Sequence, residues 1–303
     1  MSGILTKVSV PQDLPGELPP PYSGHGSSSS SASRIGDHCA NDPPLDPSVK
    51  SSGEIVKLAE TDIYISKPSD LESQGTCLLL LLTNGVGVNS VANQLQADHF
   101  AREGYFVAMP DLFEGDPAPN ATTVTSHVES QELLEQIKFK AAEGIKGFMI
   151  DMWLARHTPE KTMPIIEKVL AAVKEEYGDK NYTVSLGTYA VGYCFGGKYA
   201  LRLAATDLII AGAVAHGTLV SKEDIISIRK PISFACVEND NFFPDDLREE
   251  GLRYLQENNI EHEMRVYEGV PHGFGVYGSY SEEHIKAAQK QVFQQFLDFM
   301  SKH

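Results

Sequence analysis

Hydrophobic residues along most of this chain alternate between strand-like runs and helix-like patterns. Residues 54–58 and 62–66 alternate apolar and polar positions and predict an antiparallel hairpin. A continuous apolar run predicts a buried strand at 77–83, and further strands are predicted at 105–110, 188–193, 209–216, 232–237 and 263–267. Helical spacing predicts helices at 90–103, 129–156, 160–176, 195–205, 245–258 and 281–301, the last with a capping box formed by Ser279 and Glu282. This alternation predicts an α/β fold with a mainly parallel sheet, covered by helices on both faces.

Residues 1–47 differ from the rest of the chain. They hold 8 of the 17 prolines and a run of serines, without hydrophobic periodicity. Such a segment cannot bury enough apolar surface to offset its ordering entropy. The sequence therefore predicts two parts, a flexible Pro/Ser-rich arm at 1–47 and one α/β domain at 48–303. An arm exchanged in a homodimer is the alternative.

The overall charge limits the classes of molecule that this protein is expected to bind. Of the 303 residues, 41 are acidic and 25 are basic, giving a net charge of −16, which argues against nucleic acid and anionic membranes. No apolar run approaches the length of a membrane span, which is about 20 residues. We expect a cytoplasmic protein that binds a small-molecule substrate.

Cysteine and histidine spacing predicts neither a disulfide framework nor a metal site. The four cysteines, Cys39, Cys77, Cys194 and Cys236, form no C-x-x-C pair, and the histidines form no H-x-x-x-H pair. No glycine-rich nucleotide motif follows a predicted strand, so no cofactor is expected. Cys77 and Cys236 are interpreted as core residues, and Cys39 as incidental to function.

Cys194 stands out because it lies in Gly-Tyr-Cys-Phe-Gly-Gly, between a predicted strand and a predicted helix. This is the nucleophile-elbow pattern with cysteine in place of serine. Gly192 and Gly196 would tolerate the tight turn, and Gly197 would let the helix approach the sheet. The free N–H groups at the start of the helix would lower the pKa of the Cys194 thiol.

An acid and a histidine follow the cysteine in the order that an elbow enzyme needs. Asp240 comes shortly after the strand at 232–237, and His272 shortly after the last strand. Glu238 or Asp245 could supply the acid instead, and His272 could simply be a turn residue.

Stabilising an oxyanion requires two N–H groups aimed at the developing charge. The amide of Phe195, directly after the cysteine, is one candidate. Gly85, in the glycine-containing loop after the strand at 77–83, is the other. This loop could also need its glycines only for a turn.

Five segments together resemble one family. "NGVGVN", "MPDLFEGDP", "GYCFGGKYA", "ENDNFFP" and "VPHGFG" are similar to the dienelactone hydrolases, particularly their fungal relatives, from about residue 54 to the C-terminus. The resemblance implies the α/β-hydrolase fold, a triad of Cys194, His272 and Asp240, and oxyanion donors at Gly85 and Phe195. It also implies hydrolysis of an ester or lactone through a thioester.

Two positions depart from the family pattern. Asn84 stands where the family usually has glutamate, and Val276 where it has an arginine that binds the substrate carboxylate. A neutral hydrophobic substrate is therefore expected, with Asn84 among the substrate-binding residues. Other candidates for lining the pocket, each of which could instead be core packing, are Trp153, Tyr193, His216, Phe243 and Phe274.

Two other functions remain open at this point. A thiol is a soft nucleophile, so Cys194 could serve carbon–carbon hydrolysis, isomerisation or cyclisation in secondary metabolism. Alternatively, the replacement at Asn84 could belong to a non-catalytic, ligand-binding relative.

Overall fold

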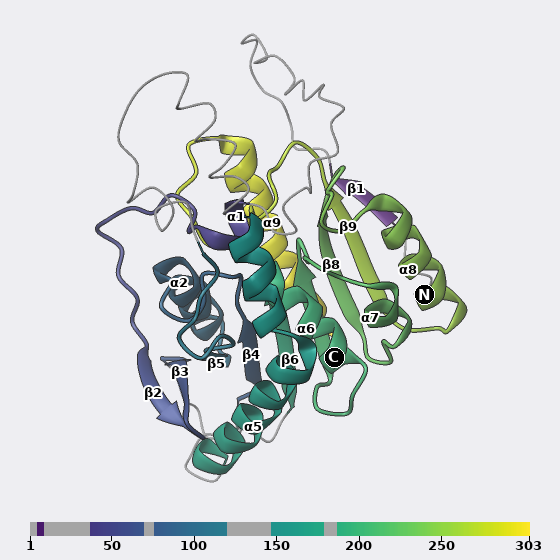
Figure 1. Ribbon diagram of the computed structural model, residues 1–303. Helices are drawn as coiled ribbons and strands as arrows, with labels where there is room; N and C mark the ends of the chain where they lie inside the picture. Colours follow the sequence, from purple (N-terminus) through teal and green to yellow (C-terminus); the bar gives the residue numbers. More distant parts are fainter. Residues whose placement is uncertain (1–4, 9–36, 70–75, 120–146, 179–186) are drawn as a thin grey trace.

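The computed structural model describes residues 5–8, 37–69, 76–119, 147–178 and 187–303 (Figure 1). Nine strands form one sheet within these residues. Their bounds are β1 Leu5–Val8, β2 Glu54–Leu58, β3 Thr61–Ser66, β4 Leu78–Leu82, β5 Phe106–Pro110, β6 Thr188–Tyr193, β7 Ala211–Ala215, β8 Ile232–Val237 and β9 His262–Tyr267.

The sheet is mainly parallel, as the sequence predicts. Its strand order is β1-β9-β8-β7-β6-β4-β5-β3-β2, and only the pairs β2–β3 and β3–β5 are antiparallel. The predicted hairpin is confirmed, with Glu54 opposite Ile65. Because β4, β6, β7, β8 and β9 all run in one direction, the loops at their carboxyl ends meet along one edge of the sheet.

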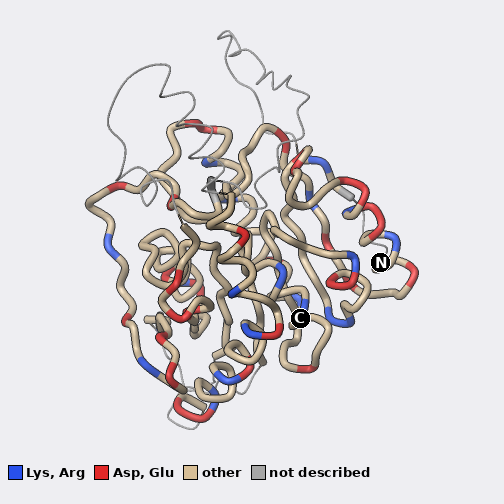
Figure 2. The backbone as a smooth tube through the Cα atoms, viewed as in Figure 1, with Lys and Arg blue, Asp and Glu red and all other residues tan. Residues whose placement is uncertain are grey.

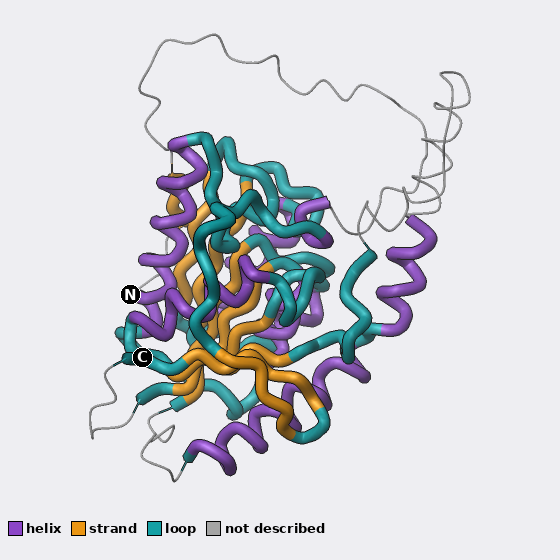
Figure 3. Tube along the Cα trace, turned by 90° about the vertical axis from the view of Figure 1, so that its left-hand side faces the viewer, coloured by secondary structure: helices purple, strands orange, loops and turns teal. Residues whose placement is uncertain are grey.

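Helices cover both faces of the sheet (Figures 1 and 3). Their bounds are α1 Asp37–Ala40, α2 Val91–Arg102, α5 Pro159–Tyr177, α6 Phe195–Ala204, α7 Lys222–Ile226, α8 Asp245–Glu257 and α9 Glu283–Met300. Successive strand residues point to opposite faces. Leu79 and Leu81 of β4 therefore pack with α2 and α9, whereas Leu80 and Leu82 pack with α6, α7 and α8. The two hydrophobic layers explain why the central strands are apolar throughout.

Charged residues avoid this centre. Strands β4, β6, β7 and β8 contain no Lys, Arg, Asp or Glu, and Figure 2 shows the charged positions mainly on helices and loops. Among the helices of the described residues, none has the length and apolar character to cross a membrane.

The first 47 residues contribute more to the fold than a loose arm would. β1 pairs in parallel with β9, and Lys7 lies within 3.7 Å of both Glu238 and Glu268. Residues 37–47 lie against the domain, and Cys39 is fully buried. Residues 1–4 and 9–36 are outside the described part, so the proposed division at residue 47 stays a prediction.

Some local predictions need correction. The predicted helix 129–156 is described only at 147–156, which is helical. Helix α9 has Glu282 as its N-cap residue without a side-chain cap, so the predicted capping box is wrong. Ser279 instead contacts the N-terminal segment: its amide donates to the Pro44 carbonyl (2.6 Å). A capping box occurs at α7, between Ser221 and Asp224.

Helix α6 packs unusually close to the sheet. A Cβ on Gly196 would lie 2.1 Å from the Leu82 carbonyl oxygen, and a Cβ on Gly192 would lie 2.4 Å from the Gly196 oxygen. On Gly197, a Cβ would lie 2.8 Å from a Val214 methyl. The sequence-based role of these three glycines is confirmed: only hydrogen fits where the helix and the sheet meet.

Gly196→Ala should therefore destabilise the fold by about 3 kcal/mol or more, because backbone atoms cannot move aside cheaply. Urea unfolding followed by circular dichroism measures this effect. Gly147→Ala is the matched control, since a Cβ there has no atom within 4 Å. It should change stability by less than about 1 kcal/mol. Equal effects of the two substitutions would contradict the close-packing argument.

Candidate active site

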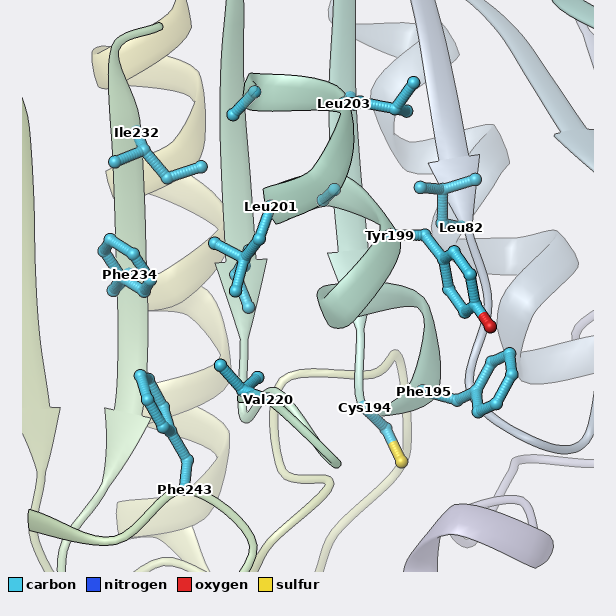
Figure 4. Packing of buried hydrophobic residues seen from close by; sticks show 14 of the residues in the cluster. Leu82, Cys194, Phe195, Tyr199, Leu201, Leu203, Val220, Ile232, Phe234 and Phe243 are labelled. Carbon is cyan, nitrogen blue, oxygen red and sulfur yellow. The ribbon is translucent and has the colours of Figure 1, made fainter. Parts of the chain in front are cut away.

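Cys194 sits at a strained turn between β6 and α6. Its φ of 50° and ψ of −113° lie in a region that non-glycine residues seldom adopt. The turn is held by backbone bonds, since the Cys194 amide donates to Ala215 (3.1 Å) and its carbonyl accepts from Gly197 (3.0 Å). Figure 4 shows the sulfur projecting beyond the start of α6. The thiol is thus placed at the edge where the strand-end loops gather.

Asp240 and His272 meet beside this thiol. A carboxylate oxygen of Asp240 lies 2.7 Å from Nδ1 of His272, and both side chains are buried. The other oxygen of Asp240 accepts from the Phe242 amide (2.9 Å), which fixes the carboxylate. The alternative acids are engaged elsewhere: Glu238 with Lys7, and Asp245 with Arg248. Asp240 is therefore the acid that the fold brings to His272.

Thr218 bridges the histidine and the thiol. Its Oγ1 lies 3.0 Å from Nε2 of His272 and donates to the sulfur of Cys194 at 3.3 Å. Its amide also donates to the Cys194 carbonyl (3.0 Å), which holds the threonine at the elbow. Sequence reasoning missed Thr218. The available signal was its place two residues after His216, in the loop that follows β7.

Cys39 is a second thiol in the same cluster, so its interpretation as incidental is wrong. The sulfurs of Cys39 and Cys194 and a ring nitrogen of His272 all lie within 4.8 Å of one another. The Cys39 sulfur is also 3.7 Å from Oγ1 of Thr218. No local pattern marked Cys39, because 155 residues separate it from Cys194 and only the fold brings the two together.

The electrostatics of the cluster follow from burial and from these contacts. Burial alone would lower the pKa of His272, but its hydrogen bond to Asp240 and its contact with Cys39 outweigh burial and raise the pKa to about 9. A histidine with this pKa is an imidazolium at neutral pH. The positive charge can therefore stabilise a thiolate beside it.

The two thiols titrate as a pair. The hydrogen bond with Cys194 holds the pKa of Cys39 well below its ordinary value. Burial, reinforced by the contact with Cys39, raises the pKa of Cys194 well above it. Physically, the first proton leaves easily because the other thiol and the imidazolium stabilise one thiolate. The second proton is retained because two adjacent negative charges would be buried together.

Two sulfurs and an imidazole nitrogen form a ligand set that zinc accepts. Cys39, Cys194 and His272 are thus the residues that could hold a soft cation in the described part of the chain. The sequence prediction of no metal site rested on local spacing and could not test this long-range combination.

The loop after β4 lies next to the elbow, as the oxyanion prediction requires. The Gly196 amide donates to the Thr83 carbonyl (2.9 Å), and the Gly85 carbonyl accepts from Ala118 (2.8 Å). A Cβ on Gly85 would lie 2.6 Å from the Cys39 carbonyl oxygen. The Phe195 amide faces the Cys194 sulfur and lowers its pKa, although burial dominates.

Asn84 is buried in this loop with a fixed orientation. Its Oδ1 accepts from the Asn93 side chain (2.8 Å) and from the Val86 amide (3.1 Å). These two donors identify the oxygen, because a flipped amide would face them with its own donors. Its Nδ2 has no acceptor among the described residues. Asn84 can therefore donate one further hydrogen bond.

The predicted aromatic residues divide between the two sides of the sheet. Trp153 packs on Phe195, with ring centres 5.2 Å apart, and donates to the Asp116 carbonyl. Phe243 packs on Phe234 in the same core. Tyr193 and Phe274 belong instead to the core beneath α2 and α9.

Two rings contact the histidine itself. His216 lies 5.0 Å from His272 between ring centres, as its predicted place at the end of β7 suggests. Phe242, which the sequence analysis passed over in favour of Phe243, lies 4.8 Å away and is half-buried. Phe242 thus completes an aromatic surround of the imidazole.

Comparison with known proteins gives the chain a family context. The sequence model of the dienelactone hydrolase family matches residues 64–303. Hydrolase tropI from Talaromyces stipitatus is 31% identical over 251 residues, covering 83% of this chain and 90% of that protein. Hydrolase pyvD from Aspergillus violaceofuscus is 29% identical over 254 residues, covering 84% and 91%.

Among solved structures, a thermophilic esterase from Thermogutta terrifontis superimposes with a TM-score of 0.55 at 13% identity. The superposition covers 84% of this chain and 94% of the esterase. At this identity the likeness supports the α/β-hydrolase fold and nothing finer.

Asp240→Asn should return the pKa of His272 from about 9 toward its ordinary 6.5. Because the folded pKa is raised, the stabilisation by charged His272 is fully present below about pH 6.5 and is lost as pH rises through 9. Asp240→Asn should therefore cost about 1–3 kcal/mol at pH 6.5 and less at pH 10.

An NMR titration of the imidazole and urea unfolding at the two pH values measure these effects. Asp245→Asn is the matched control, because Asp245 contacts Arg248 and not the histidine. An unchanged His272 pKa in Asp240→Asn would refute the assigned electrostatics.

Proposed function

This chain belongs to the dienelactone hydrolase family and is a hydrolase of the ester or lactone type, and from this premise we propose that Cys194, His272 and Asp240 form its catalytic triad. One observation carries the proposal. Asp240 lies 2.7 Å from His272, and Thr218 connects that histidine to the Cys194 sulfur. Three residues from three separate loops thus converge in the order acid, base and nucleophile.

Cys194 is the better nucleophile of the two clustered thiols. It sits at the amino end of the ten-residue helix α6, whose dipole favours negative charge, and the Phe195 amide faces its sulfur. Its strained backbone at the elbow is the kind of strain that clusters at active sites. Cys39 lies within a helix of four residues and not at a strand–helix turn.

The reaction follows from this geometry as acyl transfer to water. The two hydrogen-bonded thiols share one negative charge. When that charge lies on Cys194, its thiolate attacks the substrate carbonyl, and the resulting oxyanion accepts hydrogen bonds from the Phe195 and Gly85 amides. The His272 imidazolium then gives its proton to the leaving alkoxide, and a thioester remains on Cys194. His272 next takes a proton from water, which attacks the thioester and releases the acid.

Thr218 acts as a positioning residue in this scheme. With His272 protonated, its hydroxyl accepts from the Nε2–H of His272 and donates to the Cys194 sulfur. This arrangement satisfies both groups in the absence of substrate. It also separates the imidazole from the sulfur, so proton transfer passes through the hydroxyl or follows its displacement by substrate.

The surroundings of the triad favour a neutral, hydrophobic substrate. The rings of Phe242 and His216 flank the imidazole. Val276, at the position where related enzymes have arginine, is buried. Among the described residues, the hydrogen-bonding and charged partners of Cys194 and His272 include no Lys or Arg side chain. The spare donor of Asn84 suits a neutral oxygen of the substrate.

Cys194→Ala should lower kcat/KM for p-nitrophenyl acetate by about 10³-fold or more, because the nucleophile is lost. Cys39→Ser should lower it by about tenfold at most. Rapid acid quench and peptide mass mapping should locate the acetyl group on Cys194 in the wild type and in Cys39→Ser. An acetyl group on Cys39, or full turnover by Cys194→Ala, would overturn the assignment.

The substrate class has a separate test. A neutral aryl lactone should be hydrolysed with a kcat/KM at least about tenfold higher than that of a matched lactone bearing a carboxylate, because one unpaired charge near the triad costs about 1.4 kcal/mol or more. Product masses from the same assays distinguish hydrolysis from isomerisation or carbon–carbon cleavage. Equal use of both lactones would refute the preference for a neutral substrate and leave the triad intact.

A further inference from the structure

Cys39 is a buried thiol that the hydrolytic scheme does not use. Its sulfur lies within 4.8 Å of both the Cys194 sulfur and a His272 ring nitrogen. It is fully buried, whereas the sheet cysteine Cys77, at the opposite end of β4, is only partly buried. A second thiol this close to a reactive one has a direct chemical consequence, because thiolates attack oxidised sulfur.

The segment that carries Cys39 covers the active site. The Cys39 carbonyl contacts Gly85, where even a methyl group would collide at 2.6 Å. The following residues are anchored: Asp42 accepts from the Ser90 hydroxyl, and the Asp46 amide donates to the Ser279 hydroxyl at 3.2 Å. Helix α1 is therefore held over the loop that carries the proposed oxyanion donor.

We propose that Cys39 and Cys194 form a reversible disulfide under oxidation by hydrogen peroxide. The inference rests on the proposed function only in taking Cys194 as the reactive thiol. Joining the sulfurs requires them to approach from at most 4.8 Å to about 2.05 Å. Cys39 resides on a single four-residue turn, so this movement disturbs no long element.

The chemistry balances in two steps. The Cys194 thiolate attacks a peroxide oxygen, the O–O bond breaks, and Cys194 becomes a sulfenic acid while hydroxide leaves. The Cys39 thiolate then attacks the sulfenic sulfur, an S–S bond forms, and a second hydroxide leaves. The protons of the two thiols, one of them held by His272, convert both hydroxides to water. Two thiols are thus oxidised and one peroxide is reduced.

The disulfide has two effects on the hydrolase. It removes the nucleophile and fastens α1 over Gly85, so the oxidised protein cannot turn over. It also intercepts the sulfenic acid before further oxidation, which would be irreversible. Cys39 thus protects Cys194 from overoxidation, and reduction restores the enzyme.

The test uses the full-length protein treated with hydrogen peroxide in the presence of a chelator. Intact mass and non-reducing peptide maps should show the loss of two hydrogens and a linked Cys39–Cys194 peptide. Esterase activity should fall at least about tenfold and return with dithiothreitol. Cys77→Ser is the matched control and should behave like the wild type.

Cys39→Ser, with Cys39→Ala as a second variant, should form no such link. Each should instead gain two oxygens on Cys194, and dithiothreitol should not restore activity. The inference is overturned if the wild type overoxidises at the same rate as these variants without a linked peptide. The mass readout is independent of turnover. If the link forms in a protein that has no esterase activity, only the proposed function is refuted. If the reduced protein is active but forms no link on oxidation, only the disulfide is refuted.

Discussion

The close approach of helix α6 to strands β4 and β6 is the constraint on which the candidate site depends. Backbone meets backbone here, because a Cβ at Gly192 or Gly196 would lie within 2.4 Å of a carbonyl oxygen. This contact forces the connecting residue into a left-handed conformation, with Cys194 at a φ of 50°. The thiol is thereby lifted to the end of the sheet and faces the amide of Phe195. The same close contact therefore determines both how α6 packs on the sheet and where the Cys194 thiol lies.

Around that thiol, the fold brings together polar side chains that are buried from solvent. The buried side chains of this cluster are those of Cys39, Cys194, Thr218 and His272. Burial makes each charge among them costly unless a neighbouring group compensates it. The hydrogen bond that His272 donates to Asp240 lets the imidazole stay charged, and the charged imidazole in turn favours one thiolate. Each group determines the protonation of the next, so the cluster behaves as one unit.

The N-terminal segment belongs to this unit and is more than a tether. Residues 37–47 supply the second thiol and lie against Gly85, while Pro44 and Asp46 contact Ser279. The packing of α1 therefore decides which sulfur can reach Cys194. A composition that predicts a loose arm hides this role, because burying one short turn needs little hydrophobic periodicity.

The sequence by itself determined the alternating α/β architecture, the elbow at Cys194, and the order in which Asp240 and His272 follow. These features depend on local periodicity, on glycines at a tight turn and on residues placed just after strands. The tertiary structure decided what lies between and above them: Thr218 in a loop after β7, Phe242 rather than Phe243 against the histidine, and Cys39 beside the nucleophile. No local pattern specifies such contacts, because side chains distant along the chain meet only when the sheet brings its loops to one edge.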